Sequence, residues 1–142
     1  MGDSSTQRIV EEGCSLNARI YHAHAIVTYG KPIEVREQTL IRQVFPGYEI
    51  VDPGLYEENE EKLLGGMDYC KKLVESCDAL AYSRIQGKVT AGVGAEVEHA
   101  LALGKQVYEL VGNGVRQVFE PPSYVSREET RKLYVEWMME NL

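Results

Sequence analysis

Short apolar segments alternate along this chain with longer segments whose apolar residues keep helical spacing, and few folds accommodate that order. The strand-like stretches are Ala18–Val27, Tyr48–Val51, Asp78–Ser83, Gln106–Val111 and Val115–Phe119. Strands that alternate with helices of about 10 to 15 residues form βαβ units, which build a parallel sheet with helices on both faces. The sequence therefore predicts a single α/β domain with a doubly wound, parallel, five-stranded sheet.

Four segments have the features of helices. One follows Pro32 and ends before Pro46, one starts in the acidic run 57–61 and continues to Cys77, one begins near Ala95 and ends at Gly104, and the last is capped by Ser126 and Glu129. The last helix is amphipathic, so we expect its apolar face to dock against the sheet or its loops.

Charge and cysteine content restrict the partners and the compartment. Twenty-two Asp and Glu against fifteen Lys and Arg give a net charge of −7, which repels a nucleic-acid polymer but still allows a small anion to bind at local donors. Three cysteines without a C-x-x-C spacing indicate neither a disulfide framework nor a zinc cluster, and Cys70 and Cys77 are expected to fill the apolar side of a helix.

The chain has no apolar run of the about 20 residues that cross a bilayer, and no signal pattern at its start. We therefore expect a cytoplasmic protein without membrane contact. Residues 1–17 are expected to form a loosely ordered leader, and residues 18–142 the folded domain.

Ligands of such sheets bind beyond the carboxyl ends of the strands, where the strand order reverses. The loops His22–Lys31 and Arg84–Glu96 should meet there. In the second loop, glycines permit close approach of a ligand, and Glu96 is expected in the first turn of a helix. The helix dipole keeps a carboxylate there ionised, which suits a nucleophile or an electrostatic stabiliser. A glutamate in a first turn is also common without any function.

Four parts of the sequence together resemble one family. They are Tyr21 on the first strand, Asp78 at the start of the third, Gly-Val-Gly-Ala-Glu at 92–96 and Ala-Leu-Ala-Leu-Gly-Lys at 100–105. This pattern is similar to the nucleoside 2-deoxyribosyltransferase superfamily, which includes the 2'-deoxynucleoside 5'-monophosphate N-glycosidases. The resemblance covers Ala18–Leu110. It implies a flavodoxin-like sheet, a homodimer or larger homo-oligomer, and cleavage of the bond between a base and deoxyribose; we expect no cofactor.

The resemblance also implies roles for particular residues. Glu96 occupies the position of the family's catalytic glutamate, and Tyr21 that of the tyrosine beside it. Thr90 stands where nucleoside transferases have aspartate and the monophosphate glycosidases have serine. Since an uncharged hydroxyl tolerates a phosphate, the expected substrate is a small nucleoside 5'-monophosphate, with a nucleoside as the alternative. Gly92 and Gly94 are expected to contact it.

The chain differs from the family pattern in two places. The turn after the first strand, residues 22–31, reads His-Ala-His-Ala-Ile-Val-Thr-Tyr-Gly-Lys, where family members have a glycine-rich turn. Cys70 stands where many members have an aspartate that assists the base, and Asp68, the nearest acidic residue, is the candidate substrate contact in its place.

His22 and His24 are the alternative acids for the leaving base, because a near-neutral imidazole at a strand end can donate a proton. Two histidines without a third ligand do not indicate a metal site, so no metal is expected. Lys31 and Lys88 are the candidate phosphate ligands, since each lies in one of the two loops.

Two functions of other classes stay open. The first is a nucleotide-binding or sensor module that keeps the fold without turnover, which the altered first loop and Cys70 would explain. The second is a structural assembly partner, with the face of Trp137 and Met138 buried between subunits.

Overall fold

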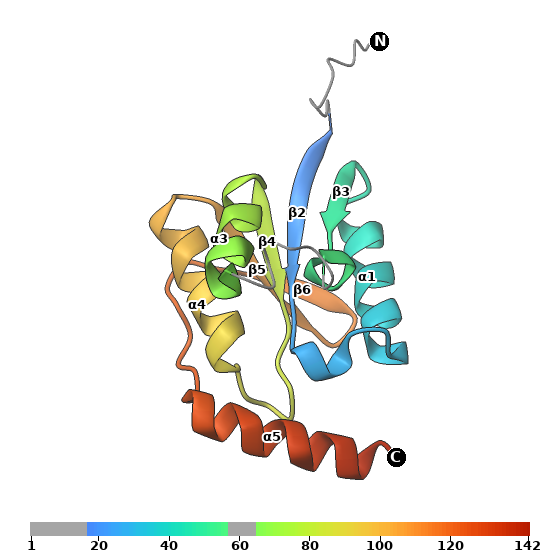
Figure 1. The fold of residues 1–142 in the computed structure, drawn as a ribbon. Helices are drawn as coiled ribbons and strands as arrows, with labels where there is room; N and C mark the ends of the chain where they lie inside the picture. Colours follow the sequence, from blue (N-terminus) through green and yellow to red (C-terminus); the bar gives the residue numbers. More distant parts are fainter. Residues whose placement is uncertain (1–16, 57–64) are drawn as a thin grey trace.

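The computed structural model describes residues 17–56 and 65–142, which form a five-stranded sheet of order β3-β2-β4-β5-β6 (Figure 1). The strands are β2 (Ala18–Ala23), β3 (Tyr48–Val51), β4 (Ala79–Tyr82), β5 (Gln106–Val111) and β6 (Gly114–Val118). The first four are parallel, and β6 is antiparallel to β5. The α/β prediction is confirmed, and the sheet is mostly rather than entirely parallel. The reason is the two-residue turn Gly112-Asn113, because so short a turn joins only antiparallel strands.

Helices cover both faces of the sheet and one of its edges. They are α1 (Pro32–Val44), α3 (Met67–Glu75), α4 (Ala91–Ala102) and α5 (Arg127–Glu140), with 3-10 turns η2 (Ile26–Thr28) and η3 (Pro53–Tyr56). Figure 1 shows α1 on one face, α3 and α4 on the other, and α5 across the end at which β2 finishes. The carboxyl ends of the parallel strands therefore lie next to α5.

Two hydrophobic clusters sandwich the sheet. On the α3 and α4 side, Tyr21, Leu80 and Val107 pack against Val74 and Val97. On the α1 side, residues of β2 and β4 pack against Ile41, among them Ile20, Ala79 and Ala81. All four residues of β4 are buried, as expected of a central parallel strand covered on both faces.

Two element bounds differ from the sequence prediction by about four residues, whereas those of β4, β6 and the end of α3 differ by one or two. β2 ends at Ala23 instead of Val27, because the chain turns into η2, where Thr28 donates from both its amide and its hydroxyl to Ala25 O. α4 begins at Ala91 instead of near Ala95, because Thr90 is its N-cap and accepts from Val93 N. Glu96 therefore lies in the second turn of α4, not in its first. The predicted start of a helix in 57–61 lies outside the described residues.

Other sequence predictions about these elements are confirmed. Gly104 follows α4 with a φ of 76°, the left-handed conformation that ends a helix. Ser126 caps α5 and accepts from Glu129 N. Asp78 accepts from Arg19 N at 2.8 Å and so ties the beginnings of β2 and β4 together, at the opposite edge of the sheet from α5.

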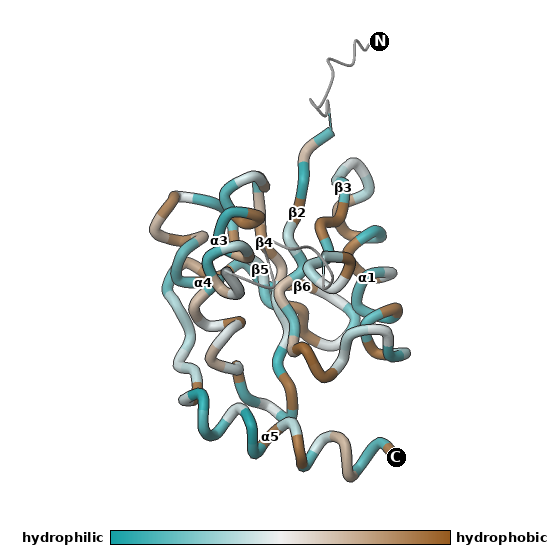
Figure 2. Tube along the Cα trace, viewed as in Figure 1, coloured by the Kyte–Doolittle hydropathy of each residue, from teal (hydrophilic) through white to brown (hydrophobic). Residues whose placement is uncertain are grey.

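Helix α5 docks against the segments that follow β2 and β4. Leu133 packs with Ala25 after β2 and Ile85 after β4, and Trp137 is half-buried against them. Figure 2 shows strongly hydrophobic residues on the segments just above α5, whereas α5 itself is largely hydrophilic. Met138 is 48% exposed. The helix therefore closes the carboxyl edge with one narrow apolar side.

Within the described residues, none of the helices is both long and apolar enough to cross a membrane.

Substitution of Gly94 tests the close packing of α4 against Tyr124, in the segment that precedes α5. A Cβ added there would overlap Tyr124 Cγ and lie 2.7 Å from Tyr124 Cβ, whereas one added at Gly92 meets only Met67 Cε at 3.4 Å. We expect Gly94→Ala to lower the free energy of unfolding by about 1–3 kcal/mol, and Gly92→Ala to change it by less than about 1 kcal/mol. Urea denaturation of both variants measures the difference; equal stabilities would contradict this packing.

Candidate active site

The strand order places the two predicted loops together. From β2 the chain passes over the α1 face to β3, and from β4 it passes over the other face to β5, so the order reverses between the neighbouring strands β2 and β4. The segments that follow these two strands meet at Ala25 and Ile85, which share one hydrophobic cluster. A ligand site is expected at such a reversal.

A buried phenol and a buried carboxylate meet at this edge. The Tyr21 hydroxyl, on the α4 side of β2, donates to Glu96 Oε2 at 2.7 Å. Tyr21 is fully buried and Glu96 is 6% exposed. Burial, and then the nearby Glu96 carboxylate, raise the pKa of Tyr21 far above its usual range, so the phenol keeps its proton and holds the carboxylate in place. Tyr21 and Glu96, predicted to be adjacent, are in direct contact.

A cavity of about 170 Å³ lies against Glu96. Its lining is partly apolar with a few polar groups, which is typical of a small-molecule site; the lining residues are His24, Ile26, Tyr29, Gly66, Met67, Cys70, Thr90, Gly92, Val93, Glu96 and Tyr134. An engineered cavity of about 150 Å³ in another protein holds one benzene ring. The present cavity therefore has room for one ring-sized group, a sugar or a base.

The start of α4 supplies one wall of the cavity. Thr90 and Gly92 line it as predicted, but the Thr90 hydroxyl also caps the helix. The Ala91 amide donates to Thr130 Oγ1 at 3.0 Å, which fastens the start of α4 to α5. Gly94 is not among the lining residues; its side of the helix faces Tyr124, so the glycine allows the close approach of Tyr124.

Helix α3 supplies the opposite wall through Met67 and Cys70, which lie one turn apart on the same side. The position where the resembling family has an aspartate thus faces the cavity, and in this chain it carries a thiol. Asp68 lies on another side of α3, is exposed and does not line the cavity.

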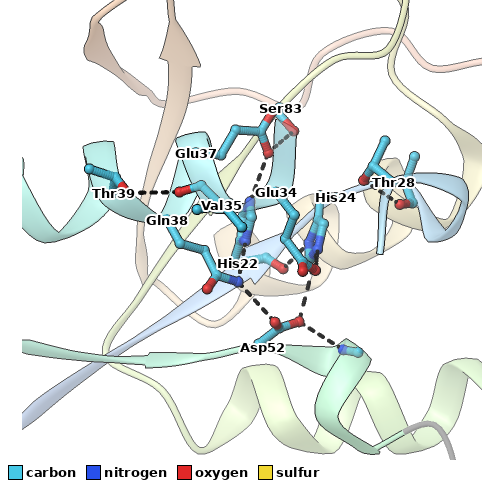
Figure 3. A network of polar contacts seen from close by, with 12 residues as sticks. His22, His24, Thr28, Glu34, Val35, Glu37, Gln38, Thr39, Asp52 and Ser83 are labelled. Atoms are coloured by element: carbon cyan, nitrogen blue, oxygen red, sulfur yellow. Dashed lines mark hydrogen bonds and ion pairs between the residues drawn. The ribbon is translucent and has the colours of Figure 1, made fainter. Parts of the chain in front are cut away.

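The two histidines stack on each other with ring centroids 3.7 Å apart, but they have different surroundings (Figure 3). His22 is fully buried and turned toward α1, where its Nε2 lies 2.9 Å from Glu37 Oε1. Burial lowers the pKa of His22. His24 lines the cavity, with its Nε2 2.7 Å from Glu34 Oε2. That a histidine protonates the leaving base stays a prediction, and only His24 is placed at the cavity.

The predicted phosphate ligands are not brought to the cavity. Lys31 and Lys88 are exposed, and neither is among its lining residues. Arg84, in the same loop as Lys88, is held by Glu109, with Nε and Oε2 2.6 Å apart. A phosphate contact from these loops therefore stays a prediction.

Sequence reasoning missed Ile26, Tyr29 and Tyr134, which close the cavity from η2 and α5. Burial is the main cause that raises the pKa of Tyr134, and the Glu96 carboxylate adds to it. Tyr134 belongs to the apolar stripe of α5, and this was visible in the sequence. The place where α5 docks depends on tertiary packing, so the sequence alone did not show that Tyr134 contributes to the site.

A second hollow, of about 620 Å³, lies between α1 and the end of β5, lined among others by Arg36, Leu40 and Leu110. It is larger, but Tyr21 and Glu96 do not line it. We place the chemistry at the smaller cavity because the buried Glu96 carboxylate, held by the Tyr21 hydroxyl, lines it.

The chain matches no known family model, and no curated protein sequence is detectably similar to it. The resemblance described above for Tyr21, Asp78 and the glycine-glutamate helix therefore stays a prediction from those residues.

A double-mutant cycle measures the contact between Tyr21 and Glu96. Hydrogen bonds to charged groups contribute about 1.5–3 kcal/mol, so we expect Tyr21→Phe and Glu96→Gln to be coupled by about 1–3 kcal/mol in the free energy of unfolding. Tyr108→Phe, on the opposite face of the sheet, serves as the control and should add to Glu96→Gln without coupling. Coupling below about 0.5 kcal/mol for Tyr21 would contradict the contact.

Proposed function

We propose that this chain cleaves the N-glycosidic bond of a nucleoside 5'-monophosphate or nucleoside, or transfers its deoxyribose to another base, with Glu96 as the catalytic carboxylate. The observation that carries the proposal is the Glu96 carboxylate, buried, held by the Tyr21 hydroxyl at 2.7 Å and facing a ring-sized cavity. The site lies at the strand-order reversal, where sheets of this kind bind ligands.

The chemistry follows that of a retaining glycosidase. Glu96 attacks the anomeric carbon C1' as the bond from C1' to the base nitrogen breaks, and the electron pair of that bond leaves with the base, which takes a proton from His24 or from water. Positive charge on the sugar is greatest in the transition state, where a buried carboxylate stabilises it most. Water then attacks C1' and gives a proton to the group that protonated the base, and the bond between C1' and Glu96 breaks, which releases the sugar and restores the Glu96 carboxylate. In transfer, a second base takes the place of water.

Tyr21 acts as a positioning residue in this scheme. Its hydroxyl occupies one carboxylate oxygen, Oε2, and so restricts the rotation of the Glu96 side chain. A fixed nucleophile avoids the loss of conformational freedom that would otherwise accompany attack. Because the phenol keeps its proton, this contact is present across the ordinary pH range.

The size and charge of the site agree with a small substrate. The cavity of about 170 Å³ holds one ring, so the rest of a nucleotide would extend beyond it. Thr90 contributes a neutral hydroxyl to the wall, where a carboxylate would repel a phosphate. The net charge of −7 opposes a polymer of phosphates far more than a single one.

Base release from a panel of nucleosides and their 5'-monophosphates, in ribose and deoxyribose forms, tests the proposal. The wild-type protein should release free base, detected by chromatography, and Glu96→Gln should lower the rate by about 10²- to 10⁴-fold. Glu98→Gln is the matched control, because Glu98 lies on the exposed side of the same helix, where it accepts a hydrogen bond from the Tyr124 hydroxyl. Its rate should stay within about threefold of wild type.

Two results would contradict the enzyme assignment: no base release from any member of the panel, or equal rates for Glu96→Gln and the wild type. Saturable nucleotide binding without product would instead support a binding or sensor module. A labelled second base, added to the reaction, separates transfer from hydrolysis, since only transfer incorporates the label.

A further inference from the structure

A second polar cluster lies beside the cavity, on the α1 side of the same edge. We propose that His24, Glu34 and Asp52 bind a divalent metal ion, with zinc as the best match. The three side chains come from the residue after β2, from α1 and from the residue after β3, and Figure 3 shows them converging. The inference is independent of the glycosidic activity proposed for Glu96.

The spacing of the donor atoms suits a small cation. One oxygen or nitrogen from each residue lies within 4.8 Å of the other two. His24 Nε2 is 2.7 Å from Glu34 Oε2 and 3.9 Å from Asp52 Oδ1. Bonds of about 2.0–2.2 Å in a tetrahedral zinc site separate its ligands by about 3.3 Å, a value between these two distances. Each of the two His24–carboxylate distances therefore lies within about 0.6 Å of the separation that a zinc site needs.

The hydrogen bonds of His24 point to a cation at its Nε2. Its Nδ1 lies 2.9 Å from His22 O, and a carbonyl oxygen only accepts, so the proton of a neutral ring belongs on Nδ1. Nε2 then presents a lone pair toward Glu34 Oε2, which carries lone pairs as well. A metal ion between the two atoms removes this conflict; the alternative is a second proton on the ring.

The surrounding donors resemble the outer shell of a metal site. Metal-binding histidines usually donate their other N–H to a carbonyl, as His24 does to His22 O, and ligating carboxylates are themselves hydrogen-bonded. Here Gly30 N donates to Glu34 Oε1 at 3.0 Å. Gly54 N donates to Asp52 Oδ1 at 2.8 Å, and Gln38 Nε2 donates to Asp52 Oδ2 at 2.9 Å. Both carboxylates are thus oriented before any ion binds.

The charge of the cluster also favours a cation. Glu34, Glu37 and Asp52 contribute three negative charges against the two imidazoles of His22 and His24. The sum is −3 with neutral rings and −3 + 2 = −1 even with both rings protonated. Within 17–56 and 65–142, no lysine or arginine forms an ion pair with these carboxylates. This excess negative charge lies on side chains that are at most 15% exposed, and a divalent ion would offset it.

An ion at this position would join three segments of the carboxyl edge, one of which lines the cavity. It would also occupy the Nε2 atom that a histidine acid needs, so a metal on His24 and proton donation by His24 to a leaving base exclude each other. The sequence alone indicated no metal because the second and third ligands lie 10 and 28 residues after His24, on other elements.

Zinc binding to the full chain tests the inference. Protein treated with a chelator and then dialysed should bind one equivalent of Zn²⁺ in calorimetry, with a higher Tm. Glu34→Gln and Asp52→Asn should each weaken zinc affinity by at least 100-fold, and Gln38→Leu, which removes an outer donor, by about 10- to 100-fold. Glu75→Gln is the matched control: it alters an exposed His99–Glu75 contact of 2.8 Å and should leave zinc affinity unchanged.

Co²⁺ provides a measurement on the unaltered chain, in case the ligand variants fail to fold. Its visible spectrum should indicate four-coordinate nitrogen and oxygen ligands without a thiolate charge-transfer band. A thiolate band would place the metal at a cysteine such as Cys70 and overturn the assignment. Absence of stoichiometric zinc binding, or full zinc affinity in both Glu34→Gln and Asp52→Asn, would overturn it as well and leave a protonated His24 as the explanation of the cluster.

Discussion

The hydrogen bond between Tyr21 and Glu96 joins strand β2 to the helix that follows β4, and the site depends on it. A carboxylate removed from water is unfavourable unless donors replace its hydration. The donor here is a phenol that burial keeps protonated, on a strand with covered faces. The cavity beside this pair lies at the reversal of strand order, and Tyr134 of α5 lines it. The position of the Glu96 carboxylate thus depends on the strand order, on the docking of α5 and on the hydrogen bond from Tyr21.

The sequence predicted most of the sheet because local patterns and global packing agree there. The bounds of β3 and β5 are as expected, since turn residues flank each apolar run. The start of α4 was misplaced because Gly92 and Gly94 suggest a loop, whereas Thr90 caps a helix that tolerates both glycines. The adjacency of Tyr21 and Glu96 followed from the family resemblance.

Other features of the site could not be predicted because they arise from contacts between distant elements. Tyr134 reaches the cavity only because α5 packs on the segments after β2 and β4. His24 faces the cavity at one side and two carboxylates at the other, so it links the proposed sugar site to the proposed metal cluster. One wall of the cavity would then be fixed by an ion and the other by Thr90 and Thr130.

A crystal structure of Glu96→Gln with a nucleoside 5'-monophosphate bound tests the central claim most directly, because the substitution preserves the shape of the site and slows cleavage. The account predicts that C1' lies about 3–3.5 Å from the side chain at position 96, with one ring of the ligand inside the cavity beneath Tyr134. A ligand bound in the hollow between α1 and β5, with its sugar remote from Tyr21 and position 96, would contradict it.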